Sequence, residues 1–128
     1  MIVLDTSVVI DCFTGARRGS RALRGVIERG ERLAIPSIVL YEWLRGPRRL
    51  DELADQETLL PRESALPFGP QEAAVAAELY TAVKNPRRRE VDLAIAACAI
   101  THAAEFWTLN PGDFRDLPRL VVSTPATK

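Results

Sequence analysis

Short apolar runs that alternate with helical segments constrain the fold of this sequence more than any other feature. These runs occupy residues 1–4, 33–35, 65–68, 105–108 and 120–122. Each run is too short for a helix and is bounded by turn-forming residues, which indicates a strand. Because strands that alternate with helices usually pair in parallel and are covered on both faces, the pattern predicts an α/β fold.

Capping and breaking residues mark the expected helices between these strands. The first helix is expected to begin at Val8, and the others to occupy residues 20–28, 37–44, 48–60, 71–83 and 89–103. A chain of 128 residues suits one domain. We therefore predict a single domain over residues 1–128, a three-layer α/β/α sandwich with a central, mainly parallel sheet of about five short strands.

Composition excludes several classes of protein. The formal net charge is zero, so overall charge does not predict a polyanion partner. The apolar stretch from Leu93 to Ile100 is far too short to cross a bilayer, and residues 1–4 are typical of a strand rather than a signal peptide. Cys12 and Cys98 form no CxxC pair and lie in apolar segments, which favours buried thiols in a reducing compartment. We expect a cytoplasmic protein without membrane contact.

Most of the positive charge is arginine, and seven of the fifteen arginines stand in three clusters. They are Arg17-Arg18, Arg48-Arg49 and Arg87-Arg88-Arg89. One interpretation is that these side chains are solvated at helix ends and in loops, as in most charge clusters. The other is that they bind phosphate groups, for which the guanidinium fork is well shaped. The sequence leaves both interpretations open.

Polar side chains follow two of the predicted strands. Asp5 comes directly after the first strand, and Asn110 and Asp113 follow the strand at residues 105–108. Ligands of an open parallel sheet bind beyond the carboxyl ends of its strands. We therefore expect these three residues at one rim of the sheet.

Glu42 and Asp92 are acids within otherwise apolar helical segments. An ionised carboxylate in such surroundings is costly unless it is paired or bound to a metal. Each acid also has a purely structural explanation. N-capping explains Asp5, and a pair with Arg45 explains Glu42. Complementation of the helix dipole explains Asp92.

The acids taken together favour a metal site. Three or four carboxylates without clustered His or Cys select hard cations such as Mg²⁺ or Mn²⁺. Without a metal, converging acids would repel one another and raise one another's pKa. A divalent ion relieves that repulsion and activates water for attack on a phosphate.

Four segments, in order, resemble the motifs of the PIN-domain ribonucleases, and more narrowly those of the VapC-like toxins of bacterial toxin–antitoxin pairs. They are residues 2–10, 37–42, 92–97 and 108–114. The resemblance covers the whole chain, at the family's usual length. It implies that Asp5, Glu42 and Asp92 are ligands of one or two Mg²⁺ or Mn²⁺ ions. It also implies that Thr6 or, preferably, Ser7 orients Asp5.

The last of these motifs often supplies a fourth acid. Here Thr108 and Asn110 occupy the Thr-x-Asn/Asp positions, and Asp113 follows. Whether Asn110 or Asp113 completes the metal site stays open, so Asp113 is a catalytic candidate and Thr108 and Asn110 are supporting candidates. The resemblance also implies that Arg87 to Arg89 face the RNA backbone.

The activity implied by the resemblance is endonucleolytic hydrolysis of RNA, which leaves 3′-hydroxyl and 5′-phosphate ends. It further implies a toxin that inhibits translation, a homodimer, and a cognate antitoxin that blocks the acids with an arginine. Two alternatives stay open: a PIN nuclease of RNA processing or decay, and a PIN-fold module that binds RNA or protein without cleavage. An aspartyl-phosphate phosphatase is disfavoured, because Ser7 stands where its second Asp would be.

Overall fold

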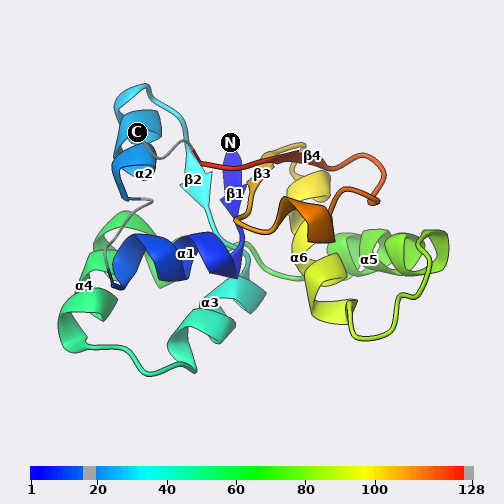
Figure 1. The fold of residues 1–128 in the computed structure, drawn as a ribbon, viewed down its shortest axis with the longest axis horizontal. Coiled ribbons are helices and arrows are strands. Elements are labelled where there is room, and N and C mark those ends of the chain that lie inside the picture. Colours follow the sequence, from blue (N-terminus) through cyan, green and yellow to red (C-terminus); the bar gives the residue numbers. More distant parts are fainter. Residues whose placement is uncertain (16–19, 126–128) are drawn as a thin grey trace.

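A parallel sheet lies at the centre of the computed structural model, which describes residues 1–15 and 20–125 (Figure 1). Within these residues the sheet has four strands: β1 (Ile2–Leu4), β2 (Leu33–Ala34), β3 (Glu105–Trp107) and β4 (Val121–Ser123). Their order is β2-β1-β3-β4, and every neighbouring pair is parallel. The predicted α/β class and parallel sheet are confirmed.

The expected strand at residues 65–68 is wrong, so the described sheet is one strand smaller than predicted. Leu66 forms only a single parallel bridge to Pro36. The Leu66 N–H donates to Ile35 O, and the Ser37 N–H donates to Leu66 O, each at 2.8 Å. The pairing ends there because Ser37 begins helix α3 (Ser37–Leu44), which turns the partner chain away from an extended path.

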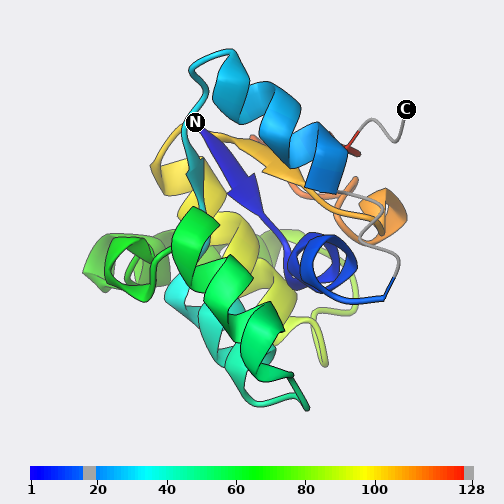
Figure 2. The same cartoon turned by 90° about the vertical axis from the view of Figure 1, so that its left-hand side faces the viewer.

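Helices cover both faces of the sheet. They are α1 (Thr6–Phe13), α2 (Ser20–Glu28), α3, α4 (Leu50–Leu59), α5 (Pro70–Ala82) and α6 (Glu90–Thr101), with two short 3-10 turns, η1 (Arg62–Ser64) and η2 (Pro111–Asp113). Figure 2 shows α2 on one face of the sheet and α3 and α6 on the other. This arrangement confirms the predicted layers, and each helix lies close to its predicted bounds.

Local chemistry sets the chain's path around the first two strands. Asp5 is the N-cap of α1, where its backbone is extended and its Oδ1 accepts the Thr6 N–H at 2.9 Å. After α2, Gly30 has φ +85°, a left-handed conformation that glycine adopts without strain. The Glu31 N–H then donates to Val26 O at 2.9 Å, so the chain turns directly into β2.

Apolar side chains of the sheet and of α6 form the core that supports the strand ends. No residue of β1 is more than 3% exposed. Helix α6 buries Leu93 and residues 95–99. The Phe106 ring of β3 packs against the Phe114 ring with centroids 4.8 Å apart, which anchors the segment that follows β3.

Both cysteines are buried and free, as the sequence predicts. Burial raises the pKa of the Cys98 thiol to about 11 and that of Cys12 to about 12, so both thiols are protonated at neutral pH. In residues 1–15 and 20–125, no helix combines the length and apolar content that a membrane span requires.

Candidate metal centre

The order of the strands creates a switch point at the carboxyl ends of β1 and β3. From β1 the chain enters β2 on one side and, later, β3 on the other. In open parallel sheets, ligands bind in the crevice at such a point. The Asp5 N–H donates to Trp107 O at 2.9 Å, which keeps the two strand ends side by side. Asp5 therefore lies at the rim where its position after β1 predicts it.

The Asp5 carboxylate is buried and accepts several hydrogen bonds. The residue is only 6% exposed. Besides the bond from the Thr6 N–H, Ser7 Oγ donates to Asp5 Oδ2 at 3.0 Å, as expected for the orienting hydroxyl. Thr108 Oγ1 donates to the same oxygen at 2.7 Å from a fully buried position. These contacts fix the orientation of the Asp5 carboxylate.

The same two hydroxyl groups also hold the segment after β3. Ser7 Oγ accepts the Leu109 N–H at 3.1 Å, and Thr108 Oγ1 accepts the Asn110 N–H at 3.0 Å. Each hydroxyl therefore bridges the Asp5 carboxylate and the backbone of residues 109–110. This bridging fixes the first acid relative to the loop that carries Asp113.

Glu42 lies on α3 and is held from two directions. Thr6 Oγ1 donates to Glu42 Oε1 at 2.5 Å, and Arg45 Nη2 lies 3.6 Å from Glu42 Oε2. The Glu42 side chain is 21% exposed, so it is not simply a solvated residue. The pair with Arg45 exists as the structural explanation predicts, but the bond from α1 also ties Glu42 to the residue next to Asp5. Nothing in the sequence indicates this contact of Thr6.

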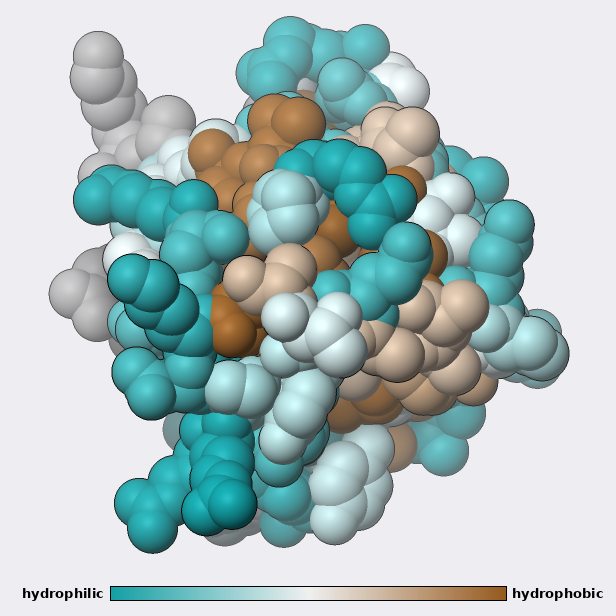
Figure 3. Space-filling model, turned by 90° about the vertical axis from the view of Figure 1, so that its right-hand side faces the viewer, coloured by the Kyte–Doolittle hydropathy of each residue, from teal (hydrophilic) through white to brown (hydrophobic). Residues whose placement is uncertain are grey.

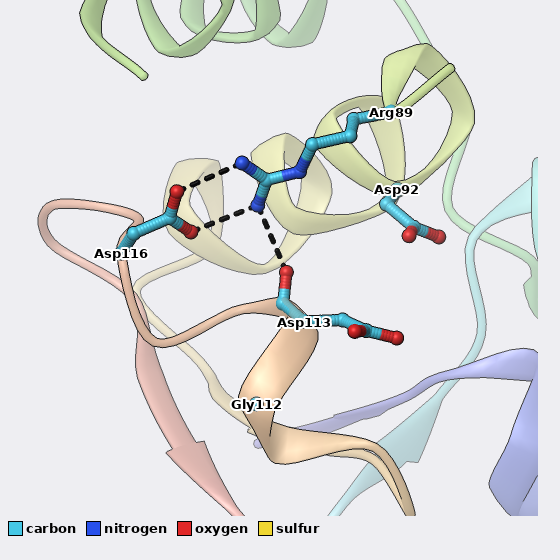
Figure 4. Close-up of a pocket in the computed structure, with 5 residues that line it drawn as sticks. All are labelled: Arg89, Asp92, Gly112, Asp113 and Asp116. Carbon is cyan, nitrogen blue, oxygen red and sulfur yellow. Dashed lines mark hydrogen bonds and ion pairs between the residues drawn. The ribbon is translucent and has the colours of Figure 1, made fainter. Parts of the chain in front are cut away.

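Asp92 and Asp113 line an open pocket of about 360 Å³ (Figure 4). Asp92 lies in the first turn of α6, and Asp113 is the last residue of η2. Figure 4 shows both carboxylates directed to the same side of the pocket, away from Asp116. Within the part of the chain that the structure describes, neither carboxylate has a hydrogen-bond partner.

Arg89 lines the same pocket and is bound by the chain itself. Its Nη1 and Nη2 donate to the two carboxylate oxygens of Asp116, each at 2.8 Å. Its Nη2 also donates to the backbone carbonyl of Asp113 at 2.9 Å. The Arg89 side chain is 22% exposed, whereas Arg87 and Arg88 are exposed residues. The three adjacent arginines therefore occupy different environments.

Two acids at this rim, Asp5 and Asp92, have raised pKa values. The pKa of Asp92 is raised to about 6, first by burial and then by neighbouring negative charges. Those charges belong to Asp5, Asp113 and Glu42. The positive charge of Arg89 acts in the opposite direction. The pKa of Asp5 is also raised, mainly by burial, although its hydrogen bonds oppose that shift.

The donor set at this rim fits a hard divalent cation. Carboxylate oxygens are the ligands that Mg²⁺ and Mn²⁺ prefer, and a divalent charge would offset the repulsion that contributes to the raised pKa of Asp92. Among residues 1–15 and 20–125, no three acidic, His or Cys side chains are already grouped closely enough to hold an ion. A bound cation would therefore require these acids to move closer together, Asp5 and Glu42 from one side and Asp92 and Asp113 from the other.

The position of Asn110 differs from that of Asp113. Asn110 lines a separate hollow of about 410 Å³, together with Ser7 and Leu109, whereas Asp113 shares a pocket with Asp92. Of the two candidates to complete the metal site, Asp113 is thus the one that shares a pocket with another predicted ligand.

Arg17 and Arg18 lie outside the described residues. Asp116, which binds Arg89, is missed by sequence reasoning. Its partner stands 27 residues earlier in the chain, and the sequence signal is that Asp116 stands two residues after the last motif.

Comparisons with known proteins agree with this fold. The chain matches the PIN domain family over residues 2–120. It is 31% identical over 136 aligned positions to Ribonuclease VapC1 of Rickettsia felis, and the match covers 99% of this chain and 98% of that relative. The chain therefore belongs to the PIN-domain family, and its sequence groups it there with the VapC ribonucleases. The resemblance seen in the sequence is confirmed.

Two solved structures share the fold. The VapBC2 complex of Rickettsia felis bound to a promoter DNA fragment has a TM-score of 0.75 and 21% identity, and the match covers 98% of this chain and 100% of that chain. A toxin–antitoxin complex from Klebsiella pneumoniae has a TM-score of 0.72 and 24% identity, with 100% of both chains covered. The likeness over full length agrees with the arrangement of sheet and helices described above.

Proposed function

We propose that this protein is a Mg²⁺- or Mn²⁺-dependent endoribonuclease. The residues that would hold the cation are Asp5, Glu42, Asp92 and Asp113. The observation that carries the proposal is that acids from four separate segments lie near one switch point of the sheet. Thr6, next to Asp5, donates to Glu42, and Asp92 and Asp113 line one pocket. The name of the relative, Ribonuclease VapC1, supports RNA as the substrate.

The residues of the site have distinct tasks in this reaction. When bound, a divalent ion activates water for in-line attack on the phosphodiester and neutralises charge on the phosphate. Asp5 is already oriented by Ser7 and Thr108, so it provides a fixed oxygen ligand. Asp92, with a pKa near 6, ionises fully when a cation offsets the surrounding negative charge. Hydrolysis leaves 3′-hydroxyl and 5′-phosphate ends.

The arginines before α6 would attract the RNA backbone. Arg87 and Arg88 are exposed and lie just before the helix that carries Asp92. Arg89 is already bound to Asp116, so we assign the main attraction to the two exposed residues. Contacts of this kind depend on salt and are independent of sequence. Unstacked RNA is the substrate form that fits, because its phosphates and bases are accessible.

We also propose that the protein is a cytoplasmic toxin. It would form a homodimer and bind a cognate antitoxin. The toxin–antitoxin complex from Klebsiella pneumoniae, which shares this fold, supports such a partner. The surface offers apolar contact area, since Tyr41, Leu50 and Val121 are 61%, 85% and 63% exposed. Figure 3 shows an apolar area, in brown, on the side where α5 lies in Figure 1.

A cleavage assay with the purified chain tests the catalytic proposal. Single-stranded RNA is incubated with the protein after treatment with a chelator, and then with added Mg²⁺ or Mn²⁺. We expect cleavage to stop without divalent ions and to return with either of them. End analysis of the fragments should find 5′-phosphates. Cleavage that resists chelation, or RNA binding without any cleavage, would contradict the proposal.

Expression in a bacterial host separates a toxin from a housekeeping nuclease. We expect growth to stop and protein synthesis to fall when the chain is expressed, and both to recover when a small gene adjacent to its own is co-expressed. The Asp92→Asn variant serves as the control that should leave growth unaffected. Normal growth with active enzyme would instead favour a role in RNA processing or decay.

A further inference from the structure

Arg89 joins two segments that are distant in the chain, at the edge of the acid pocket. Its bonds to Asp116 and to the Asp113 carbonyl, called here the Arg89 clamp, span 27 and 24 residues. The clamp therefore ties the start of α6 to the segment after η2. A guanidinium that binds a carboxylate through two parallel hydrogen bonds fixes geometry better than a single contact does.

The clamp acts on the part of the loop that the core does not hold. Phe114 and Leu117 are buried at 2% and 5% exposure, so these two positions are anchored by packing. Asp113 is exposed, and its carboxylate has no hydrogen-bond partner among the described residues. The Asp113 N–H donates to Asn110 O at 3.0 Å within η2. The bond from Arg89 to the Asp113 carbonyl ties this turn to the start of α6, in the arrangement drawn in Figure 4.

We infer that Arg89 is a positioning residue, whose clamp holds Asp113 beside Asp92 and thereby sets the affinity of the pocket for a divalent cation. This inference rests on the proposed function, because it assigns the cation to the same acids. It separates Arg89 from Arg87 and Arg88, which are exposed and without a partner among the described residues.

A purely electrostatic role of Arg89 makes the opposite prediction. Its positive charge lies in a pocket lined by three acids, so as a simple neighbour it would repel a cation. Removal of that charge alone would therefore strengthen Mn²⁺ binding. Removal of a positioning contact would weaken it, because partners that orient metal ligands typically contribute about tenfold to a hundredfold to metal affinity. The sign of the change distinguishes the two roles.

The test compares the wild-type chain with Arg89→Gln and Arg89→Lys, without RNA. Calorimetric titration with Mn²⁺ should show affinity about tenfold or more lower in Arg89→Gln, and a smaller loss in Arg89→Lys, which keeps the charge without the fork. Amide hydrogen exchange over residues 110–117 should be roughly tenfold faster in Arg89→Gln. The Lys variant also guards against loss of folding in the Gln variant.

Arg49→Gln is the matched control. Arg49 binds Asp51 through Nε and Nη2, each at 3.0 Å, but this pair is exposed and does not line the pocket. Its loss should change neither Mn²⁺ affinity nor exchange over residues 110–117. Unchanged or tighter Mn²⁺ binding in Arg89→Gln would overturn the clamp while the proposed function stands. A wild-type chain that binds no Mn²⁺ would overturn the proposed function and the clamp's role in cation affinity together.

Discussion

The acid site has two halves, a preformed half around Asp5 and an open half that contains Asp92 and Asp113. The two halves are built in different ways. Asp5 is buried and receives hydrogen bonds from Thr6, Ser7 and Thr108. The carboxylates of Asp92 and Asp113 receive none from the described residues, and burial and repulsion raise the pKa of Asp92. The first half is therefore satisfied without a cation, whereas the second half carries repulsion that the charge of Arg89 offsets only in part. If the proposed cation binds here, the half that is least satisfied without it would gain most from its charge.

Loss of one acid from each half should have the largest effect and should separate the halves most clearly. Asp5→Ala and Asp92→Asn should each lower kcat/KM for RNA by roughly a thousandfold or more. Their stabilities should change in opposite directions. Asp5→Ala removes an N-cap and leaves the buried Thr108 hydroxyl without its acceptor, which should cost about 1–2 kcal/mol. Asp92→Asn relieves repulsion and should stabilise the metal-free protein at pH 7.

Urea unfolding without divalent ions measures these stabilities. Glu63→Gln, at an exposed position on η1, is the control and should change neither activity nor stability. If Asp5→Ala and Asp92→Asn changed the free energy of unfolding in the same direction, the two halves would not differ as described. Retained activity in both variants would refute the assignment of ligands.

The hydroxyl groups around Asp5 should have the next largest effect. Thr108→Val keeps the shape of the side chain but removes the donor to Asp5 and the acceptor for the Asn110 N–H. We expect a loss of Mn²⁺ affinity of about tenfold to a hundredfold, measured by calorimetry. Thr101→Val is the matched control, because the Thr101 hydroxyl donates only to Ala97 O, at 2.8 Å, within α6. Equal losses in the two variants would mean that preorganisation of Asp5 is unimportant.

The exposed arginines should affect substrate binding more weakly. Replacement of Arg87 and Arg88 together by Gln should raise KM by about threefold to tenfold and leave kcat unchanged. The slope of log affinity against log salt concentration should become shallower by about 1–2. A double replacement of Arg21 and Arg24, exposed residues of α2, controls for general loss of charge. An unaltered slope would leave Arg87 and Arg88 as solvated loop residues.

The dependence of stability on pH should show the smallest effect. Asp92 has a pKa of about 6 in the folded protein and 3.8 as a model group, so the folded state binds more protons between these values. The free energy of unfolding should therefore fall as pH rises from about 4 to 6, by about 1 kcal/mol after allowance for solvent screening. This contribution should be absent in Asp92→Asn. In the wild-type protein, saturating Mn²⁺ should restore the lost free energy of unfolding at pH 7. A metal-free profile that is the same in wild type and Asp92→Asn would contradict the unsatisfied state of this half.

The sequence predicts the preformed half better than the open half. Asp5 follows a buried strand directly, and its cap, its rim position and its Ser7 contact all depend on residues within a few positions. The helices are also close to prediction, because their ends are set by local capping and by proline and glycine. The strand expected at residues 65–68 fails because the start of α3 removes its partner, which is a tertiary effect.

The open half depends on contacts between distant residues. The sequence does not distinguish the three adjacent arginines, Arg87 to Arg89. The fold shows that Arg89 is the one that binds Asp116. The choice between Asn110 and Asp113 likewise depends on which side of the loop faces α6. No periodicity or spacing carries that information, because it arises from how two segments pack.

The hydroxyl groups of Ser7 and Thr108 give the network around Asp5 a fixed polarity. Each hydroxyl has a single proton, and a backbone amide already donates to its oxygen, so that proton is directed at Asp5 Oδ2. An asparagine at position 5 would have to meet the same three donors with one oxygen and a donating amide. Asp5→Asn is therefore not a silent isostere here: it would reverse part of the network, and redesign of this site must replace the carboxylate and both hydroxyls as one unit.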